Sequence, residues 1–113
     1  MQRIIDPQKS VDYLIAHSKG YAIAEANKVY MEEFRKTVKA ECMKDAELLG
    51  IKTAAIQERE AYRSEKYKAH LEALKEAVRA REEARWLMIA AQERIAVWRS
   101  QEASNRRVEG ATV

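Results

Sequence analysis

Apolar side chains recur every three or four residues over the first half of the chain, as on one face of an amphipathic α-helix. Asp6 followed by Pro7 is typical of a helix start, because Asp caps free amide groups and Pro fits the first turn. Gly50 suits a left-handed cap at the other end. We therefore predict a helix over about 7–49. One side of it is expected to carry Ile23, Asn27, Tyr30, Phe34, Val38, Glu41, Leu48 and Leu49, flanked by Met31 and Cys42.

Gly20 complicates this helix. In a straight helix Val11 and Leu14 lie nearly opposite the later apolar face. We therefore expect a kink or break near Gly20, which would make residues 7–19 a short separate helix. A continuous helix is the alternative, because a mid-helix glycine costs only about 1 kcal/mol.

The middle of the chain, residues 50–64, carries no sustained apolar face. Thr53 and Ser64 are suitable N-caps, so we predict a connector with a short helix at about 54–62. A second long helix is predicted over about 65–104. The tail, residues 105–113, has little to bury and is expected to fray.

Both tryptophans lie in the second long helix, whose apolar residues cover more than one face between residues 86 and 98. Trp86 and Trp98 are rotated by about 120° from each other, so they do not form a single stacking platform. One is expected to pack within the chain and the other to face a second chain or the N-terminal arm. The predicted interface consists of Ala80, Ala84, Trp86, Leu87, Ala91, Ile95 and Trp98.

Two long helices of similar length joined by a short connector favour an all-α fold. We predict that they form an antiparallel helical hairpin and that residues 1–113 are a single domain. An isolated hairpin buries little surface, so we expect two copies to pair into a four-helix bundle. Asn27, Glu41 and Asp45 interrupt the apolar face of the first helix. They are either buried and paired with Arg81 and Arg85 or exposed at the edge of the bundle.

The net charge of +3 comes from 21 Lys and Arg against 18 Asp and Glu, and it permits a nucleic-acid partner without requiring one. The sequence shows no membrane span, signal peptide, metal-ligand spacing or phosphate-binding loop. The lone Cys42 fits a reducing cytoplasm. We expect a cytoplasmic protein that is not an enzyme and holds no metal or other cofactor.

Two groups of basic residues are candidates for phosphate contacts, although each also fits a solvated helix surface. One group lies on the outer side of the first helix. The other lies near the C-terminus, where few acidic residues intervene and Trp98 is available to stack on unpaired bases. The candidate nucleic-acid-binding residues are Lys28, Arg35 and Lys39 in the first group, and Arg94, Arg99, Arg106 and Arg107 in the second.

The segments KVYMEEFRKTVKAECMKDAE, TAAIQEREAY and IAVWRSQEASNRR resemble a group of small all-helical early proteins of tailed bacteriophages and prophages. The resemblance covers about residues 20–107. Members of this group are often encoded near genes for recombination or single-strand annealing. The resemblance implies a phage protein acting in the cytoplasm of the bacterial host, with DNA metabolism as the setting.

The resulting hypothesis is a dimeric phage accessory protein that binds another macromolecule during DNA recombination or replication. Its partner would be single-stranded DNA, a phage protein or a host protein. The alternatives are an inhibitor of a host defence or repair protein, and a structural or scaffold component of the virion.

Overall fold

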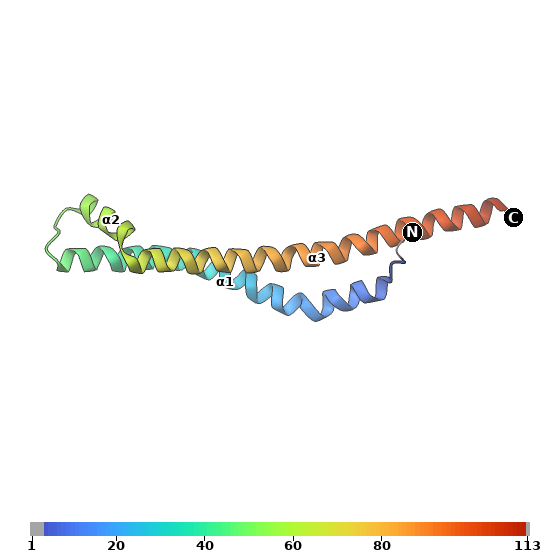
Figure 1. The fold of residues 1–113 in the computed structure, drawn as a ribbon, viewed down its shortest axis with the longest axis horizontal. Coiled ribbons are helices and arrows are strands. Elements are labelled where there is room, and N and C mark those ends of the chain that lie inside the picture. The colour runs from blue at the N-terminus through green and yellow to red at the C-terminus, as the bar shows by residue number, and fades with distance from the viewer. Residues whose placement is uncertain (1–3, 113) are drawn as a thin grey trace. The chain divides into compact units, whose positions relative to one another are not determined.

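A computed structural model describes residues 4–112, which form helices and turns and no strand (Figure 1). The helices are α1 (Pro7–Leu48), α2 (Ala54–Arg63) and α3 (Glu65–Thr112). The all-α prediction is confirmed. The contacts divide the chain into two units, of which unit 2 comprises Ile23–Glu82 and unit 1 has residues 4–22 and 83–112 as its described part. Each unit contains segments of both long helices.

The ends of the helices follow the predicted capping residues. The Asp6 carboxylate accepts a hydrogen bond from the Gln8 amide at 3.0 Å, and Pro7 is the first residue of α1. At the other end Gly50 has a φ of +98°. The Ile51 amide donates to the Ala46 carbonyl at 3.1 Å, and the Gly50 amide donates to the Glu47 carbonyl at 3.0 Å. This pairing is a Schellman motif, which satisfies carbonyl groups at the helix end.

Ser64 separates α2 from α3 and bonds to both helices. Its hydroxyl donates to the Ala61 carbonyl at 2.8 Å and accepts a hydrogen bond from the Tyr67 amide at 3.2 Å. The predicted N-cap at Ser64 is therefore confirmed. Thr53 occupies the N-cap position of α2, but its side chain forms no capping hydrogen bond.

The expected break at Gly20 and the expected fraying of the tail are not found. Helix α1 runs through Gly20 without a break, and a Cβ added there would meet nothing within 4 Å. An exposed glycine in this position costs little enough for the helix to continue. Helix α3 continues to Thr112 instead of fraying from residue 105. Its backbone hydrogen bonds are local, and Arg106, Arg107, Glu109 and Ala111 are strong helix formers. Val113 lies outside the described residues.

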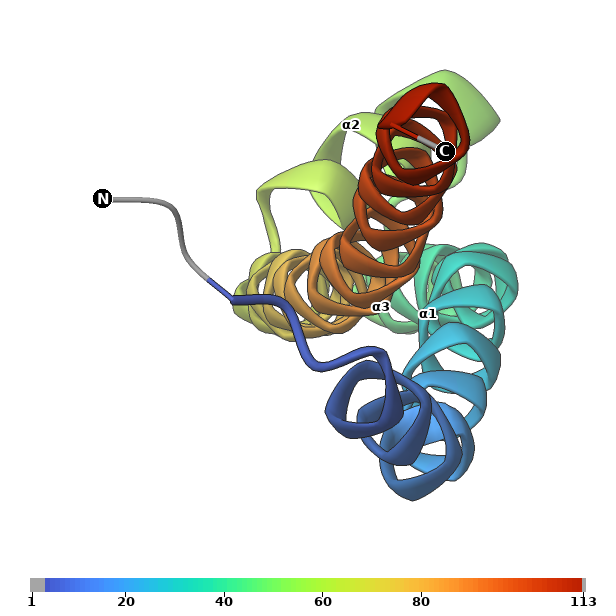
Figure 2. The same ribbon diagram turned by 90° about the vertical axis from the view of Figure 1, so that its right-hand side faces the viewer.

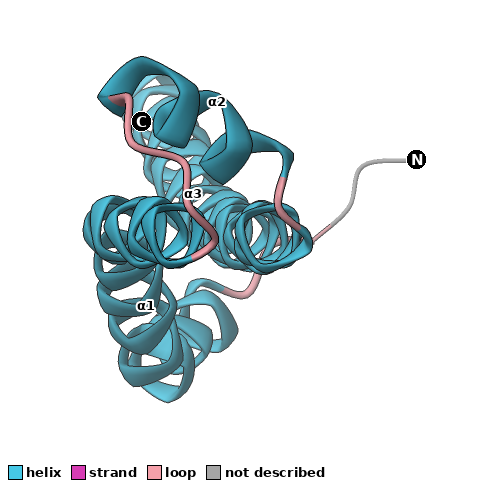
Figure 3. Cartoon of the chain, turned by 90° about the vertical axis from the view of Figure 1, so that its left-hand side faces the viewer, coloured by secondary structure: helices cyan, strands magenta, loops and turns pink. Residues whose placement is uncertain are grey.

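Unit 2 has a core at which all three helices meet. Val38 and Cys42 of α1, Ala61 of α2 and Tyr67 of α3 are buried together. Helix α2 lies alongside the adjoining ends of α1 and α3 (Figures 1 and 3). Ala61 has no exposed surface, so α2 packs closely at this point.

The two long helices run antiparallel within unit 2. Ion pairs join Lys66 to Glu41 at 2.6 Å and Arg81 to Glu25. His70 bonds through Nε2 to the Met31 carbonyl at 2.9 Å. Later residues of α3 thus contact earlier residues of α1.

The buried face of α1 differs from the predicted one. It contains Val38, Cys42 and Ala46, whereas Ile23 and Tyr30 are about 60% exposed. Helices α2 and α3 both cover the Cys42 side, and the sequence pattern of α1 alone does not contain that information. Asn27, Glu41 and Asp45 are exposed, so they are not the buried partners of Arg81 and Arg85.

Unit 1 has much less buried surface. Ser10 on α1 and Ala91 on α3 are its buried residues within the described range. The residues before α1 and its first turns line a hollow of about 390 Å³ together with Arg94 of α3. Figure 2 shows the blue start of α1 next to the orange part of α3.

Candidate nucleic-acid interface

The C-terminal basic group lies on α3 in unit 1. Arg94, Arg99, Arg106 and Arg107 are all exposed. The Arg106 side chain donates to the Glu102 carbonyl at 3.4 Å. Within residues 4–112 the other three form no ion pair or side-chain hydrogen bond. Glu102 is the single acidic residue between positions 94 and 107.

The structure does not bring these four arginines onto one side. Arg99 and Arg106 are seven residues apart and share a side of α3. Arg94 is rotated by roughly 140° from Arg99, at about 100° per residue. It lines the hollow at the start of α1, beside Asp6 and Lys9. The candidate surface in unit 1 therefore consists of Arg99, Arg106 and Arg107, and we call it the arginine surface.

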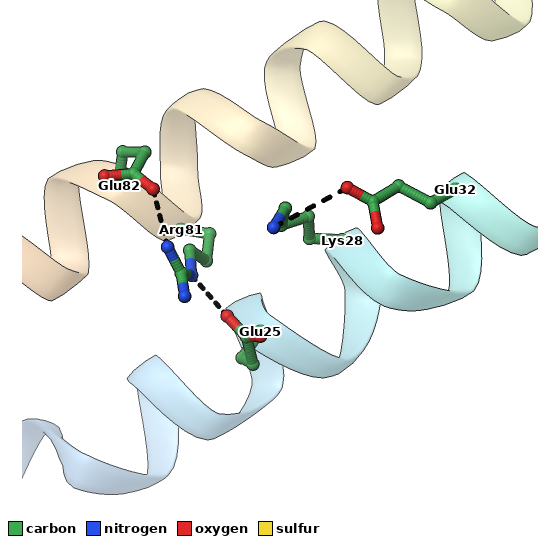
Figure 4. A network of polar contacts seen from close by, with 5 residues as sticks. All are labelled: Glu25, Lys28, Glu32, Arg81 and Glu82. Carbon is green, nitrogen blue, oxygen red and sulfur yellow. Dashed lines mark hydrogen bonds and ion pairs between the residues drawn. The ribbon is translucent and has the colours of Figure 1, made fainter.

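The first-helix basic group lies on α1 in unit 2. Lys28 is paired with Glu32 at 3.6 Å on the same helix, near the Arg81–Glu25 pair (Figure 4). Its charge is thus engaged on the helix surface. Arg35 and Lys39 are instead part of a different arrangement, which includes residues of α2 and α3.

Arg35 and Lys39 line a hollow of about 340 Å³ in unit 2, together with Lys36, Tyr62 and Tyr67. We call it the tyrosine hollow. The Tyr62 and Tyr67 rings meet edge to face, with their centroids 5.2 Å apart. Lys39 lies over the Tyr62 ring, with Nζ 4.9 Å from the centroid. Three cations and two aromatic rings from three helices thus surround one concave surface.

The charge of Lys39 is held by a short network. Its Nζ donates to Glu58 Oε1 at 2.8 Å, and the Tyr62 hydroxyl donates to the same oxygen at 3.3 Å. The hydrogen bond with Glu58 raises the pKa of Lys39 above its ordinary value. The hydrogen bond from Lys39 lowers the pKa of Glu58 in turn. Both groups are therefore charged at neutral pH, and together they fix the Tyr62 ring.

The predicted interface residues have unequal exposure. Trp86 and Leu87 are 60% and 49% exposed, and the Arg85 guanidinium lies 5.3 Å from the Trp86 ring centroid. Ala91 is only 1% exposed, so the chain itself already covers it. The remaining interface candidates, Ala80, Ala84, Ile95 and Trp98, are half-buried.

Sequence reasoning missed Lys36, Tyr62 and Tyr67 as candidate ligand contacts. Tyr62 and Tyr67 are five residues apart, on either side of the Ser64 cap, which is a weak signal for two rings in contact. Neither tyrosine is close enough to Arg35 along the chain for helical spacing to predict a contact. Their convergence depends on how α2 folds back onto α1.

Within the described range, no helix has the length and apolar character needed to cross a membrane. Residues 4–112 also contain no cluster of three His, Cys, Asp or Glu side chains that could hold a metal ion. Comparisons with protein-family models, curated proteins and solved structures give no match to this chain. The resemblance to phage proteins therefore stays a prediction.

Proposed function

We propose that this chain is a small bacteriophage accessory protein that binds single-stranded DNA during phage recombination or replication. The arginine surface carries the proposal. Arg99 and Arg107 are exposed and form no ion pair with any residue of the described chain. Lys and Arg side chains that lack an internal partner are available to displace counterions from phosphate groups. The resemblance to small helical phage proteins supplies the setting, which is phage recombination or replication.

The test is an anisotropy titration of a labelled single-stranded oligonucleotide, with the matched duplex as comparison, at about 50 and 200 mM salt. The double variant Arg99→Gln/Arg107→Gln removes two of the proposed contacts. For single strands each contact contributes about 0.7 to the slope of log affinity against log salt. The variant should therefore lower the slope by about 1.4 and weaken binding at low salt.

The matched control is Arg63→Gln/Arg79→Gln, which removes the same charge from unit 2. Both arginines are exposed, and they pair with Glu60 and Glu76 at 3.4 and 2.5 Å. This control should bind nearly as well as the unchanged protein. Equal losses in the two variants would indicate a net-charge effect and would contradict the arginine surface. Binding that does not respond to salt would contradict the function itself.

We also propose that the long helices form an antiparallel hairpin and that two copies pack into a four-helix bundle. The antiparallel contacts of unit 2 support the hairpin. Ile23 and Tyr30, seven residues apart on α1, are about 60% exposed and offer an apolar surface for a second copy. Sedimentation equilibrium should give a dimer mass, and Ile23→Glu/Tyr30→Glu should give a monomer. An unchanged mass in the variant would exclude this surface.

A second candidate function is inhibition of a host defence or repair protein. The exposed Trp86 ring with Arg85 against it favours this candidate, because Trp and Arg are enriched in binding hot spots. It predicts that Trp86→Ala abolishes capture of one bacterial protein and leaves oligonucleotide binding unchanged. A virion component would instead be found in purified particles.

A further inference from the structure

The tyrosine hollow of unit 2 offers two kinds of contact side by side. Arg35 and Lys36 are exposed cations on α1, and Tyr62 is an aromatic ring on α2 that is 45% exposed. Phosphate binding uses the first kind of contact and base stacking uses the second. We propose that the tyrosine hollow binds one nucleotide unit, with the phosphate on Arg35 and Lys36 and the base on Tyr62.

The charge distribution assigns the phosphate to Arg35 and Lys36 rather than to Lys39. The positive charge of Lys39 is already paired with the Glu58 carboxylate, at a distance of 2.8 Å between Nζ and Oε1. Arg35 forms no ion pair or side-chain hydrogen bond with any residue between 4 and 112. Lys36 has only a 3.5 Å pair with Glu33, in which both side chains are more than 70% exposed. Such a surface pair is weak and exchanges readily for a phosphate.

The ring of Tyr62 is held in place before any ligand binds. Tyr67 packs against it, Lys39 lies over it, and its hydroxyl donates to Glu58. Tyr67 is itself buried in the core of unit 2. A preorganised ring loses little conformational entropy when a base stacks on it. The Lys39–Glu58 pair therefore positions the ring, and Lys39 lines the hollow with its charge already paired to Glu58.

The volume of the hollow matches a small ligand. Ligand pockets span about 300–1,000 Å³, and the hollow of about 340 Å³ lies at the lower end of that range. This space fits one nucleotide rather than several. The nucleotide could be free or could belong to an unpaired strand, because a base paired in a duplex does not expose its face. The inference takes only the class of ligand from the proposed function. The tyrosine hollow lies in unit 2, whereas the arginine surface lies in unit 1, so the two can be tested separately.

The test uses calorimetric titrations of the full chain with adenosine monophosphate, adenosine, inorganic phosphate and a single-stranded oligonucleotide. Arg35→Gln/Lys36→Gln should weaken the monophosphate about tenfold or more and leave adenosine little changed. Tyr62→Ala should also weaken the monophosphate about tenfold, the scale of losing one stacked base, and leave inorganic phosphate unchanged. Tyr62→Phe keeps the ring but loses the hydrogen bond to Glu58, so it should bind the monophosphate more tightly than Tyr62→Ala does.

The matched control for charge is Lys75→Gln/Arg79→Gln on α3, where both side chains are exposed and paired on their own helix. Circular dichroism checks that each variant folds. If Tyr62→Ala does not fold, the exposed Arg35→Gln/Lys36→Gln variant still decides the question. Equal binding of the monophosphate and of the strand by Arg35→Gln/Lys36→Gln and by the unchanged protein would overturn the proposal.

The two sources of the nucleotide give different patterns. Binding of the monophosphate that depends on the hollow supports a free nucleotide. Hollow-dependent binding of the strand alone supports an unpaired base within DNA. Absence of both overturns the inference. The proposed function fails separately, when strand binding does not depend on Arg99 and Arg107.

Discussion

Unit 1 and unit 2 use the same two helices but bury very different amounts of side chain. Unit 1 has two small buried residues in its described part, Ser10 and Ala91. Unit 2 has more buried residues, drawn from all three helices and including the large side chains of Tyr67 and His70. They are Val38, Cys42, Ala46, Ala61, Tyr67, His70 and Ala77. Helix α2 contributes to the difference, because Ala61 packs with Val38, Cys42 and Tyr67 as a third element of the unit 2 core.

This comparison shows that helix content does not report stability along this chain. The long helices continue through both units, yet most of the free energy of unfolding should come from unit 2, where apolar surface is removed from water. Regions with few buried contacts open at low free energy and are the ones available to bind partners. Unit 1 is therefore expected to open locally while unit 2 stays folded.

The largest effect is expected from removing the aromatic ring of the unit 2 core. Tyr67→Ala should lower the free energy of unfolding by about 3 kcal/mol, because it leaves a cavity between the three helices. Tyr13 in unit 1 is half-buried and stacks on His17. Tyr13→Ala should cost less than about 1 kcal/mol, since half-exposed side chains contribute less. Urea unfolding followed by circular dichroism measures both, and similar losses would contradict the comparison.

The second prediction uses overpacking at a matched pair of buried alanines. Ala61→Leu in unit 2 should cost about 1–3 kcal/mol of global stability. Ala91→Leu in unit 1 should instead disrupt the local side-chain packing and accelerate amide hydrogen exchange in residues 83–112. The amides of unit 2 should keep their protection. Equal acceleration in the two units would show that they unfold as one.

A smaller effect is expected from the helix caps. Ser64→Ala removes the hydrogen bonds to Ala61 and Tyr67 and should lower global stability by about 1 kcal/mol. Asp6→Ala removes a similar cap in unit 1 and should fray only the first turn of α1. Thr53→Ala is the control, because its side chain makes no capping bond and its loss should have little effect.

The smallest effect concerns pH and belongs to unit 2 alone. The pKa of Glu58 is lowered from 4.5 by the hydrogen bond from Lys39, so the folded state holds the carboxylate form more strongly than the unfolded chain does. The resulting stability is present above pH 4.5 and is lost as the pH falls through the folded-state pKa. Glu58→Gln should remove this part of the decrease in the urea-unfolding midpoint at acid pH. An unchanged pH profile would show that the pair contributes nothing to stability.

The sequence predicts the local features of this fold well. Asp6, Gly50 and Ser64 mark helix ends because capping depends on residues within a few positions. The short helix in the connector was also predicted, and it spans Ala54–Arg63. The buried face of α1 was not, because it depends on how α2 packs onto Cys42. The break expected at Gly20 is not found, because the small cost of an exposed glycine does not end a helix.

The exposure of the candidate arginines follows from the sequence. Arg99, Arg106 and Arg107 are exposed along one helix, as the local spacing of charges indicated. Arg94 lies on another side of α3, a consequence of helical rotation that could have been calculated from the sequence. The tyrosine hollow could not be found this way, since Arg35, Tyr62 and Tyr67 come from three different helices.

The positions of the two indole rings have a spectroscopic consequence. Trp86 and Trp98 both lie in unit 1, whereas Tyr30, Tyr62 and Tyr67 lie in unit 2. Intrinsic tryptophan emission therefore reports on unit 1 alone. On heating, the emission should shift to the red before the ellipticity of the whole chain falls, if unit 1 opens first. The unmodified protein thus contains its own reporter for the less buried half of its fold.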